Sequence, residues 1–455
     1  MATAAAELGE RARTCLRRGV TTARELMVEL EVSQPTLSRA LRTLGADLLA
    51  IGAARSIQYA LRDARRQELQ ATVYRVSAAG RLEPLGSLVP VHPEGFVLAR
   101  TDGARLHSDG LPWWLFDMRP QGYLGRAYNL QYGAGLGLPA RLDDWSDSHV
   151  LRALLLQGED LPGNLLLGDA ARDRFVNAPS PRAIARDGRA QSYAALAAAA
   201  ARGEHHGSSA GGEQPKFTAY AQGEAGARHV IVKFTAFNDS SVSQRWRDLL
   251  MAEHLALEVL HAHGVAAARS SVLDHGAQRF LEVSRFDREG ALGRRALFSL
   301  HALDAEFAGN AGNWPQVVRA LAREGVVERQ AVAQMELLWA FGTLIANTDM
   351  HGGNLSFIAE HGLPCQVAPA YDMTCMAFAP TSGGDLPLRE LPLTIGNEVS
   401  AAAWRQALPM AQDFIDRMRR CAALSAGFAA CLEILSARVA TAGERIARLA
   451  DGIGA

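Results

Sequence analysis

The stretch NTDMHGGNLSF, from Asn347 to Phe357, determines how the rest of the chain is interpreted. It places Asp349 five residues before Asn354. This spacing is typical of the catalytic loop of phosphoryl-transfer enzymes, in which a carboxylate accepts the proton of the attacking hydroxyl and an amide oxygen holds magnesium on the nucleotide phosphates. Asp349 is therefore the candidate catalytic base and Asn354 a candidate metal ligand. The alternative is a plain turn between a helix and a strand, because Asp, Asn and Gly also supply turn geometry.

The sequence on both sides of this loop favours the catalytic interpretation. The apolar pattern MELLWAFGTLIAN, residues 335–347, predicts a buried helix that would hold Asp349 on a rigid support. An apolar stretch after the loop ends at Asp372, in the motif AYDM, eighteen residues past Asn354. A second metal-binding carboxylate is expected at this place, so Asn354 and Asp372 are the predicted ligands of a magnesium ion.

Length and composition describe a globular chain. The 455 residues suffice for two or three domains, and a net charge of -1 with 48% hydrophobic and 21% charged residues excludes a polyelectrolyte. No run of 18 apolar residues and no apolar leader is visible, so no membrane span or secretion signal is predicted and a cytoplasmic location is expected. The five cysteines form no C-x-x-C pair, which argues against disulfides and structural zinc.

Lysine is almost absent from the chain. Of the 47 basic residues only Lys216 and Lys233 are lysines, and both fall within one window of 18 residues. A chain that otherwise uses arginine is expected to keep lysine where a compact ammonium is needed, as at a nucleotide phosphate. Chance clustering of two residues is the alternative.

A glycine-rich loop, GSSAGGEQPKF at residues 207–217, contains the first lysine. Its small residues would let the backbone approach a phosphate with its amides facing the anion, although a flexible surface turn fits equally well. The strand-like HVIVKF carries Lys233, and the amphipathic pattern at residues 249–264 carries Glu253, which would pair with Lys233 unless it lies on a solvated helix face. The candidate cofactor-binding residues are Ser209, Ala210, Gly211, Gly212, Lys216, Lys233, Glu253 and His351.

Residues 1–66 have their own organisation. Thr22 is expected to cap a helix over ARELMVEL, and a second helix begins at Gln34 with Pro in its first turn. The runs LLAIG and SIQYAL then predict a small β-wing. The segment carries eleven Arg against seven Asp and Glu, a charge of +4, whereas the remaining chain carries -5. These features predict a winged helix-turn-helix that binds duplex DNA, or alternatively a helical docking module. The candidate base-contacting residues are Ser33, Gln34, Thr36 and Arg39.

The region between these parts gives weaker signals. Residues 64–70 are predicted to form a linker, and TVYRV, SLVPV and GFVLAR are predicted to form strands between Gly and Pro turns. The aromatic stretch at residues 113–126 is expected to serve packing and loop structure rather than ligand binding. The alanine-rich stretch at residues 192–202 favours a helix by propensity.

Several of these motifs occur together in one known family. SSAGGEQPKF, VKF, the glutamate helix, VSRFDR at residues 283–288, NTDMHGGN and AYDM resemble the HipA-type serine/threonine kinases, toxins of bacterial toxin-antitoxin systems. The resemblance covers residues 70 to about 445, and the fused N-terminal module makes the chain most similar to the YjjJ-type subgroup. It implies that Ser208 is phosphorylated by the protein itself, and it assigns the same roles to Asp349, Asn354, Asp372 and Lys233.

The resemblance implies an α+β, two-lobed, protein-kinase-like fold that binds ATP and Mg²⁺. A winged helix-turn-helix at residues 1–66 would precede a β-rich N-lobe of two subdomains at 67–290, with the Gly-rich loop at 207–217, and an all-α C-lobe at 291–455. Usual HipA toxins have a separate DNA-binding antitoxin, whereas this chain supplies its own module, which leaves the need for an antitoxin open. Substrates in the family include aminoacyl-tRNA synthetases, but nothing in the sequence selects one.

Two other classes of protein also stay open. A DNA-binding transcription regulator with a nucleotide-sensing, kinase-like domain would need the N-terminal module and could dispense with Asp349. A small-molecule phosphotransferase would share the D-x-x-x-x-N loop. The intact Asp349, Asn354, Asp372 and Lys233 argue against the first, and the serine loop with VSRFDR favours a protein substrate over the second.

Overall fold

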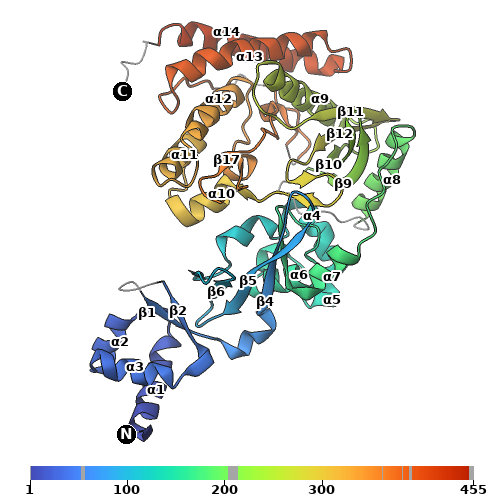
Figure 1. Ribbon diagram of the computed structural model, residues 1–455. Coiled ribbons are helices and arrows are strands. Elements are labelled where there is room, and N and C mark those ends of the chain that lie inside the picture. Colours follow the sequence, from blue (N-terminus) through green and yellow to red (C-terminus); the bar gives the residue numbers. More distant parts are fainter. Residues whose placement is uncertain are drawn as a thin grey trace.

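The computed structural model describes residues 2–52, 57–202, 214–360, 362–381, 383–388 and 392–449. The chain runs from a small helical region at the N-terminus, through a middle region built on an antiparallel sheet, to two lobes that end in long helices (Figure 1). The first of these lobes is built on a four-stranded sheet flanked by helices, and the second is mostly helical, as the predicted two-lobed α+β fold requires.

The N-terminal region contains three helices and a three-stranded sheet in the order β1-β3-β2. Thr22 caps the second helix, because its hydroxyl accepts from Glu25 N and the Glu25 carboxylate accepts from Thr22 N. The predicted helices and hairpin lie at the expected positions, and DNA binding by them stays a prediction. The elements are α1 (Ala2–Leu16), β1 (Thr21–Thr22), α2 (Ala23–Leu30), α3 (Gln34–Arg42), η1 (Gly45–Asp47), β2 (Leu48–Ile51) and β3 (Gln58–Leu61).

The middle region is a five-stranded antiparallel sheet in the order β7-β6-β5-β4-β8, packed against short helices. Leu49 and Ile51 of the N-terminal hairpin share a small core with Val89 and Val91, so the two regions are joined by packing. The predicted linker forms the 3₁₀ helix η3. The elements are η3 (Ala64–Leu69), β4 (Ala71–Val76), β5 (Leu82–Pro90), β6 (Phe96–Arg100), β7 (Arg105–Ser108), η4 (Trp113–Met118), α4 (Gly122–Tyr128), η5 (Asn129–Gly133), α5 (Ala134–Leu136), η6 (Leu142–Asp144), α6 (Asp147–Gln157), β8 (Leu165–Leu167) and α7 (Gly168–Asn177).

The N-lobe is a four-stranded antiparallel sheet, β11-β12-β10-β9, between two helices. Because successive strand residues face opposite sides, Phe280 packs with Tyr193 of α8 whereas Leu281 packs with Leu250 of α9. The two faces of the sheet therefore pack against different helices, one against α8 and the other against α9. The elements are α8 (Arg189–Ala201), β9 (Lys216–Gly223), β10 (Gly226–Phe234), α9 (Ser241–Ala262), β11 (Ser270–His275) and β12 (Gln278–Ser284).

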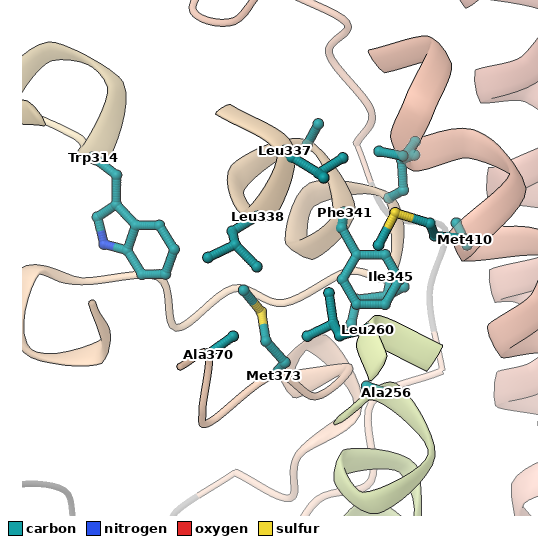
Figure 2. Packing of buried hydrophobic residues seen from close by; sticks show 14 of the residues in the cluster. Ala256, Leu260, Trp314, Leu337, Leu338, Phe341, Ile345, Ala370, Met373 and Met410 are labelled. Carbon is teal, nitrogen blue, oxygen red and sulfur yellow. The ribbon is translucent and has the colours of Figure 1, made fainter. Parts of the chain in front are cut away.

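The C-lobe surrounds the buried helix α12 and is helical apart from short strands. Figure 2 shows Leu338 and Phe341 of α12 packing near Leu260 of α9 and Met410 of α13. This core fixes the end of α12, from which the NTDMHGGN loop begins. The elements are β13 (Arg288–Glu289), β14 (Gly293–Arg294), β15 (Leu297–Ser299), α10 (Leu300–Leu303), η7 (Asp304–Ala308), α11 (Trp314–Arg323), α12 (Gln330–Leu344), η8 (Gly352–Asn354), β16 (Ser356–Ile358), β17 (Gln366–Val367), η9 (Met376–Phe378), α13 (Ala401–Arg420), η10 (Ala426–Phe428) and α14 (Ala429–Ile446).

One helical stretch within the described ranges, Ala426–Ile446, is long and apolar enough to cross a membrane by length and composition alone. The sequence has no run of 18 apolar residues, so it did not predict a span here. Its buried residues Cys431, Leu435 and Val439 belong to the C-lobe core, as is usual for a core helix. The cytoplasmic location stays a prediction.

Candidate active site

Lys233 lies at the centre of the candidate site. Its side chain leaves β10 on the face toward α9, where Nζ donates to both Oε1 and Oε2 of Glu253 at 2.7 Å and also to Oδ1 of Asp372. Lys233 is 6% exposed and Glu253 is 2% exposed. Glu253 therefore does not lie on a solvated helix face, and the pair expected from the sequence is present.

Burial and charge act against each other in this group. Burial lowers the pKa of Lys233, but the carboxylates of Asp372 and Glu253 outweigh it and raise that pKa above its ordinary value. Burial raises the pKa of Asp372, yet the charges of Lys233 and Lys216 bring it below its ordinary value. Burial raises the pKa of Glu253 to about 7 against the opposing charge of Lys233. Lys233 and Asp372 are thus held in their charged forms.

Side-chain amides of the NTDMHGGN loop make hydrogen bonds to Asp372 and within the loop itself. Asn347 Nδ2 donates to the backbone oxygen of Asp372 at 3.3 Å, and Asn347 Oδ1 accepts from Asp349 N at 3.1 Å. Asn354 Nδ2 donates to the backbone oxygen of Asp349 at 2.8 Å, which closes the loop. The Asp349 side chain is 52% exposed. A carboxylate so placed can be reached by a hydroxyl of another molecule.

Two residues beside these groups adopt a left-handed backbone conformation. Asp372 has a φ of 52° and Ala346 a φ of 60°, a region that residues other than glycine seldom occupy. Such strain persists only where the surrounding structure enforces it, and it is concentrated at functional sites. Ala346 directly precedes Asn347, and Asp372 accepts the hydrogen bond from Asn347. The two strained residues therefore lie where the loop is bonded to the candidate metal ligand.

His351 and Tyr371 make further hydrogen bonds that hold the loop in place. His351 Nδ1 accepts from Gly353 N at 3.0 Å, and the backbone oxygen of His351 accepts from Trp314 Nε1 at 2.8 Å. The Tyr371 hydroxyl donates to the backbone oxygen of Gly353 at 2.6 Å and lies 2.7 Å from Ser356 Oγ. These bonds tie the second half of the loop to Trp314 and Tyr371 of the C-lobe.

Several of these residues line a cavity of about 310 Å³. Its walls include five predicted site residues: Lys216, Lys233, His351, Asn354 and Asp372. Apolar side chains from the N-lobe sheet and from the VSRFDR motif line another part of it, namely Ile231, Val283 and Phe286. A larger surface hollow of about 1050 Å³ is lined by Arg319, Arg323 and Arg329 among others, but it contains none of the predicted site residues.

The donor set of this cavity fits magnesium. Mg²⁺ prefers oxygen ligands and is usually held by one or two carboxylates together with substrate phosphates. Asp372 offers a carboxylate and Asn354 an amide oxygen in the same cavity. In the described ranges no cluster of three or more His, Cys, Asp and Glu side chains could hold a metal ion.

The other predicted residues include those at 208–212 and the four candidates for DNA contact. Ser208, Ser209, Ala210, Gly211 and Gly212 fall outside the residues that the structure describes. Ser33 and Gln34 at the start of α3 and Arg39 in its last turn are exposed, whereas Leu37 is buried in the N-terminal core. The Thr36 hydroxyl lies 3.1 Å from that of Ser33 and accepts from Arg39 Nη2 at 3.4 Å. Ser33, Thr36 and Arg39 therefore lie along one face of the helix.

The sequence did not single out four residues that the structure places around the site: Asn347, Tyr371, Asp117 and Ser299. Asn347 and Tyr371 belong to the motifs NTDMHGGN and AYDM, and this position beside the candidate catalytic residues is the signal that could have identified them. Asp117 and Ser299 are 182 positions apart in the sequence and no pattern links them.

Comparison with known proteins places the chain in a family. Residues 208–442 match the model of the HipA-like C-terminal domain, and residues 67–176 match that of the middle domain of YjjJ-like toxins. The chain belongs to the HipA-like toxin family. Within it, the chain is 40% identical over 436 residues to "Toxin YjjJ" of Escherichia coli (strain K12), covering 95% of this chain and 98% of that protein. The resemblance stated from the motifs is confirmed.

Two solved structures are similar at low identity. One is a chain of the "Shewanella oneidensis MR-1 Toxin Antitoxin System HipA, HipB and its operator DNA complex", with a TM-score of 0.49 and 16% identity, covering 83% of this chain and 97% of that one. The other is the "Helicobacter pylori proinflammatory kinase CtkA", with a TM-score of 0.39 and 14% identity, covering 53% of this chain and 94% of that one.

Proposed function

We propose that the chain is an ATP-dependent serine/threonine protein kinase. The observation that carries the proposal is the bonding of Lys233 to both Glu253 and Asp372 in a cavity that also contains Asn354. Protein kinases need a lysine–glutamate ion pair and a metal-binding aspartate in place at the same time. A regulator that only senses nucleotide has no need for this full set together with an accessible Asp349.

Each residue then has a role in the transfer. Lys233 contacts the nucleotide phosphates, and Asp349 accepts the proton of the attacking hydroxyl. Asn354 and Asp372 would hold Mg²⁺, which would supply positive charge beside the phosphates. Lys216 and His351 lie in the cavity walls and contact the nucleotide. The proposal extends to residues 209–212, whose amides would cover the phosphates, and to Ser208 as the site of autophosphorylation.

The proposal also divides the chain by task. Residues 1–66 bind DNA, residues 67–290 form the N-lobe with its additional subdomain, and residues 291–455 form the C-lobe. Separate hydrophobic cores in the N-terminal and middle regions support the first part of this division, whereas one core joins α9 of the N-lobe to the helices of the C-lobe. The substrate is a cellular protein, with translation components as the first candidates, because the resemblance to HipA kinases implies them. An antitoxin is a further candidate partner.

Labelled ATP tests the proposal. Purified full-length protein is incubated with Mg²⁺ and γ-labelled ATP, alone and with cell lysate, and the label is located by mass spectrometry. We expect label on serine or threonine of a lysate protein and on Ser208. Label on small metabolites alone would indicate the small-molecule phosphotransferase, and binding of ATP without transfer would indicate the nucleotide-sensing regulator.

DNA binding by the N-terminal region is a second proposed function. It rests on the exposed face of α3 with Arg39 and on the charge of +4 over residues 1–66. Arginine contacts to phosphate release counterions, so the affinity for duplex DNA should fall as salt rises. We expect Arg39→Ala to weaken binding of the full-length protein to genomic fragments, as measured by fluorescence anisotropy. Arg323→Ala, which changes an exposed arginine of α11, is the control. Salt-independent binding, or equal loss in both variants, would favour the docking module.

A further inference from the structure

The aromatic element η4 reaches from the middle region into the candidate active site. Phe116 and Asp117 line the same cavity as Lys233 and Asp372. The sequence suggested only packing for this stretch. Both residues lie outside residues 208–442, so they enter the site from another part of the chain.

Asp117 holds the start of α10. Its Oδ2 accepts from the backbone nitrogen of Ser299 at 2.6 Å, and its Oδ1 accepts from the Ser299 hydroxyl at 2.6 Å. The Ser299 oxygen in turn accepts from Ala302 N at 3.1 Å, which caps the helix. One carboxylate therefore fixes both the end of β15 and the first turn of α10.

Strand β15 and helix α10 both touch the NTDMHGGN loop. Ser299 lies opposite Ser356 in the β15–β16 pair, and Leu300 N donates to the backbone oxygen of Leu355 at 2.7 Å. Gly352 lies so close to His301 that a Cβ at Gly352 would be 3.2 Å from the His301 nitrogen. This close approach transmits any shift of α10 to the loop.

Phe116 supports the same helix from the other side. Its ring stacks on that of His301 with centroids 4.9 Å apart and an interplanar angle of 29°. Trp113, at the start of η4, packs against Phe298 of β15 with centroids 4.8 Å apart. The middle region thus contacts the loop through two routes, a hydrogen-bonded one at Ser299 and an aromatic one at His301.

We infer that Asp117 and Phe116 are positioning residues for phosphoryl transfer, acting through Ser299 and His301 on the loop that carries Asp349 and Asn354. The inference rests on the proposed kinase activity. A base displaced by about 1 Å can cost about 100-fold in rate even when the substrate still binds. The middle region is therefore part of the transfer machinery and completes a site whose reacting groups all lie in the two lobes.

Asp117→Asn tests the inference, because an amide offers one oxygen in place of two and loses one of the Ser299 bonds. We expect kcat to fall about tenfold or more, a larger change than that in the Kd for ATP, because Asn keeps the size of the side chain in the cavity wall. Asp169→Asn is the matched control: it is the same change in the same region, on a carboxylate that accepts from the Tyr74 hydroxyl at 2.6 Å and does not line the cavity.

Two further variants keep the test decisive. Ser299→Ala removes the hydroxyl from the pair and should lower kcat, and Ser299→Thr should restore most of it. Phe116→Leu removes the aromatic stack but keeps an apolar side chain in the cavity wall, and it should also lower kcat. It serves where Asp117→Asn does not fold.

Hydrogen exchange separates this inference from the proposed function. Amides of residues 349–354 should exchange faster in Asp117→Asn than in the wild type or in Asp169→Asn, whether or not phosphate is transferred. A wild type that transfers no phosphate would overturn the kinase proposal. An active wild type with unchanged kcat and loop exchange in Asp117→Asn, or equal losses in Asp117→Asn and Asp169→Asn, would overturn the positioning role.

Discussion

Lys233 illustrates how little space the site leaves for a different cation. Its ammonium donates to Glu253 and Asp372 while 6% exposed. A compact ammonium on a flexible stem can serve two carboxylates in one small volume, whereas the planar guanidinium of arginine needs a wider arrangement. The composition of the chain agrees with this difference between the two side chains, because the chain has 45 arginines and only two lysines.

Lys233→Arg should therefore impair the enzyme although it keeps the charge. The bulkier fork would push Glu253 and Asp372 apart, and we expect phosphate transfer to fall by about tenfold or more. Transfer and ATP affinity are measured together, with the melting temperature as the control for folding. An active Lys233→Arg variant with normal ATP affinity would mean that the two lysines are an accident of composition.

The residues of the site differ in how far they could be predicted. Asp349, Asn354 and Asp372 lie within a short stretch whose spacing reflects its chemistry. The burial of Glu253 could not be decided, because its neighbours are equally polar and only the packing of α9 on the sheet shows which face is covered. Asp117 could not be found at all, since its partner Ser299 comes near only through folding.

At the scale of elements, the loop depends on how α12 ends. The helix is largely buried from Met335 onward, and the chain leaves it through the left-handed Ala346 directly before Asn347. The side chain of Asn347 then bonds in two directions, to Asp372 and to Asp349. The predicted helix at residues 335–347 ends three residues earlier in the structure, at Leu344, because the terminal turn is needed for this exit.

Asn347→Asp tests this exit. The carboxylate keeps an acceptor for Asp349 N but loses the donor and repels the Asp372 carbonyl, and Asn347 is 5% exposed. A buried acceptor left without its donor costs about 1–3 kcal/mol. We expect that loss in the free energy of unfolding by urea and a fall in kcat of about tenfold or more.

Thr348→Ala, at an exposed position in the same loop, is the control for this change. Equal kcat values for Asn347→Asp and the wild type would show that Asn347 does not orient Asp349.

At the scale of the whole molecule, an ionic cluster joins the middle region to the lobes. Asp287 accepts from Arg285 Nε at 2.9 Å and Nη2 at 2.8 Å, from Arg288 Nη1 at 2.6 Å, and from Gly163 N of the middle region at 3.2 Å. Burial raises the pKa of Asp287, but the charges of Arg285 and Arg288 bring it well below its ordinary value. The motif VSRFDR thus serves the joint between regions, a role that its sequence did not reveal.

The lowered pKa of Asp287 predicts a pH dependence. Its contribution to stability is fully present above the pKa of an unfolded Asp, about 4, and is lost as the pH falls toward the lower folded pKa. Asp287→Asn breaks a buried ion pair and should cost about 3–5 kcal/mol at neutral pH. The gap between wild type and variant should stay constant from about pH 7 to 5 and narrow below about pH 4.

The free energy of unfolding of both proteins across this range is the measurement, with Asp144→Asn at an exposed site as the control. A gap that does not change below pH 4 would contradict the pairing.

Phosphate transfer by Asp349→Asn tests the central claim most directly. The amide keeps the shape of the side chain but cannot accept a proton, and Asp349 does not line the cavity that contains Lys233. We predict that the variant has the melting temperature of the wild type and binds Mg-ATP with similar affinity. Its rate of phosphate transfer should be lower by about 100-fold or more. Turnover equal to that of the wild type, with the same proteins labelled, would contradict the account of this chain as a kinase that uses Asp349.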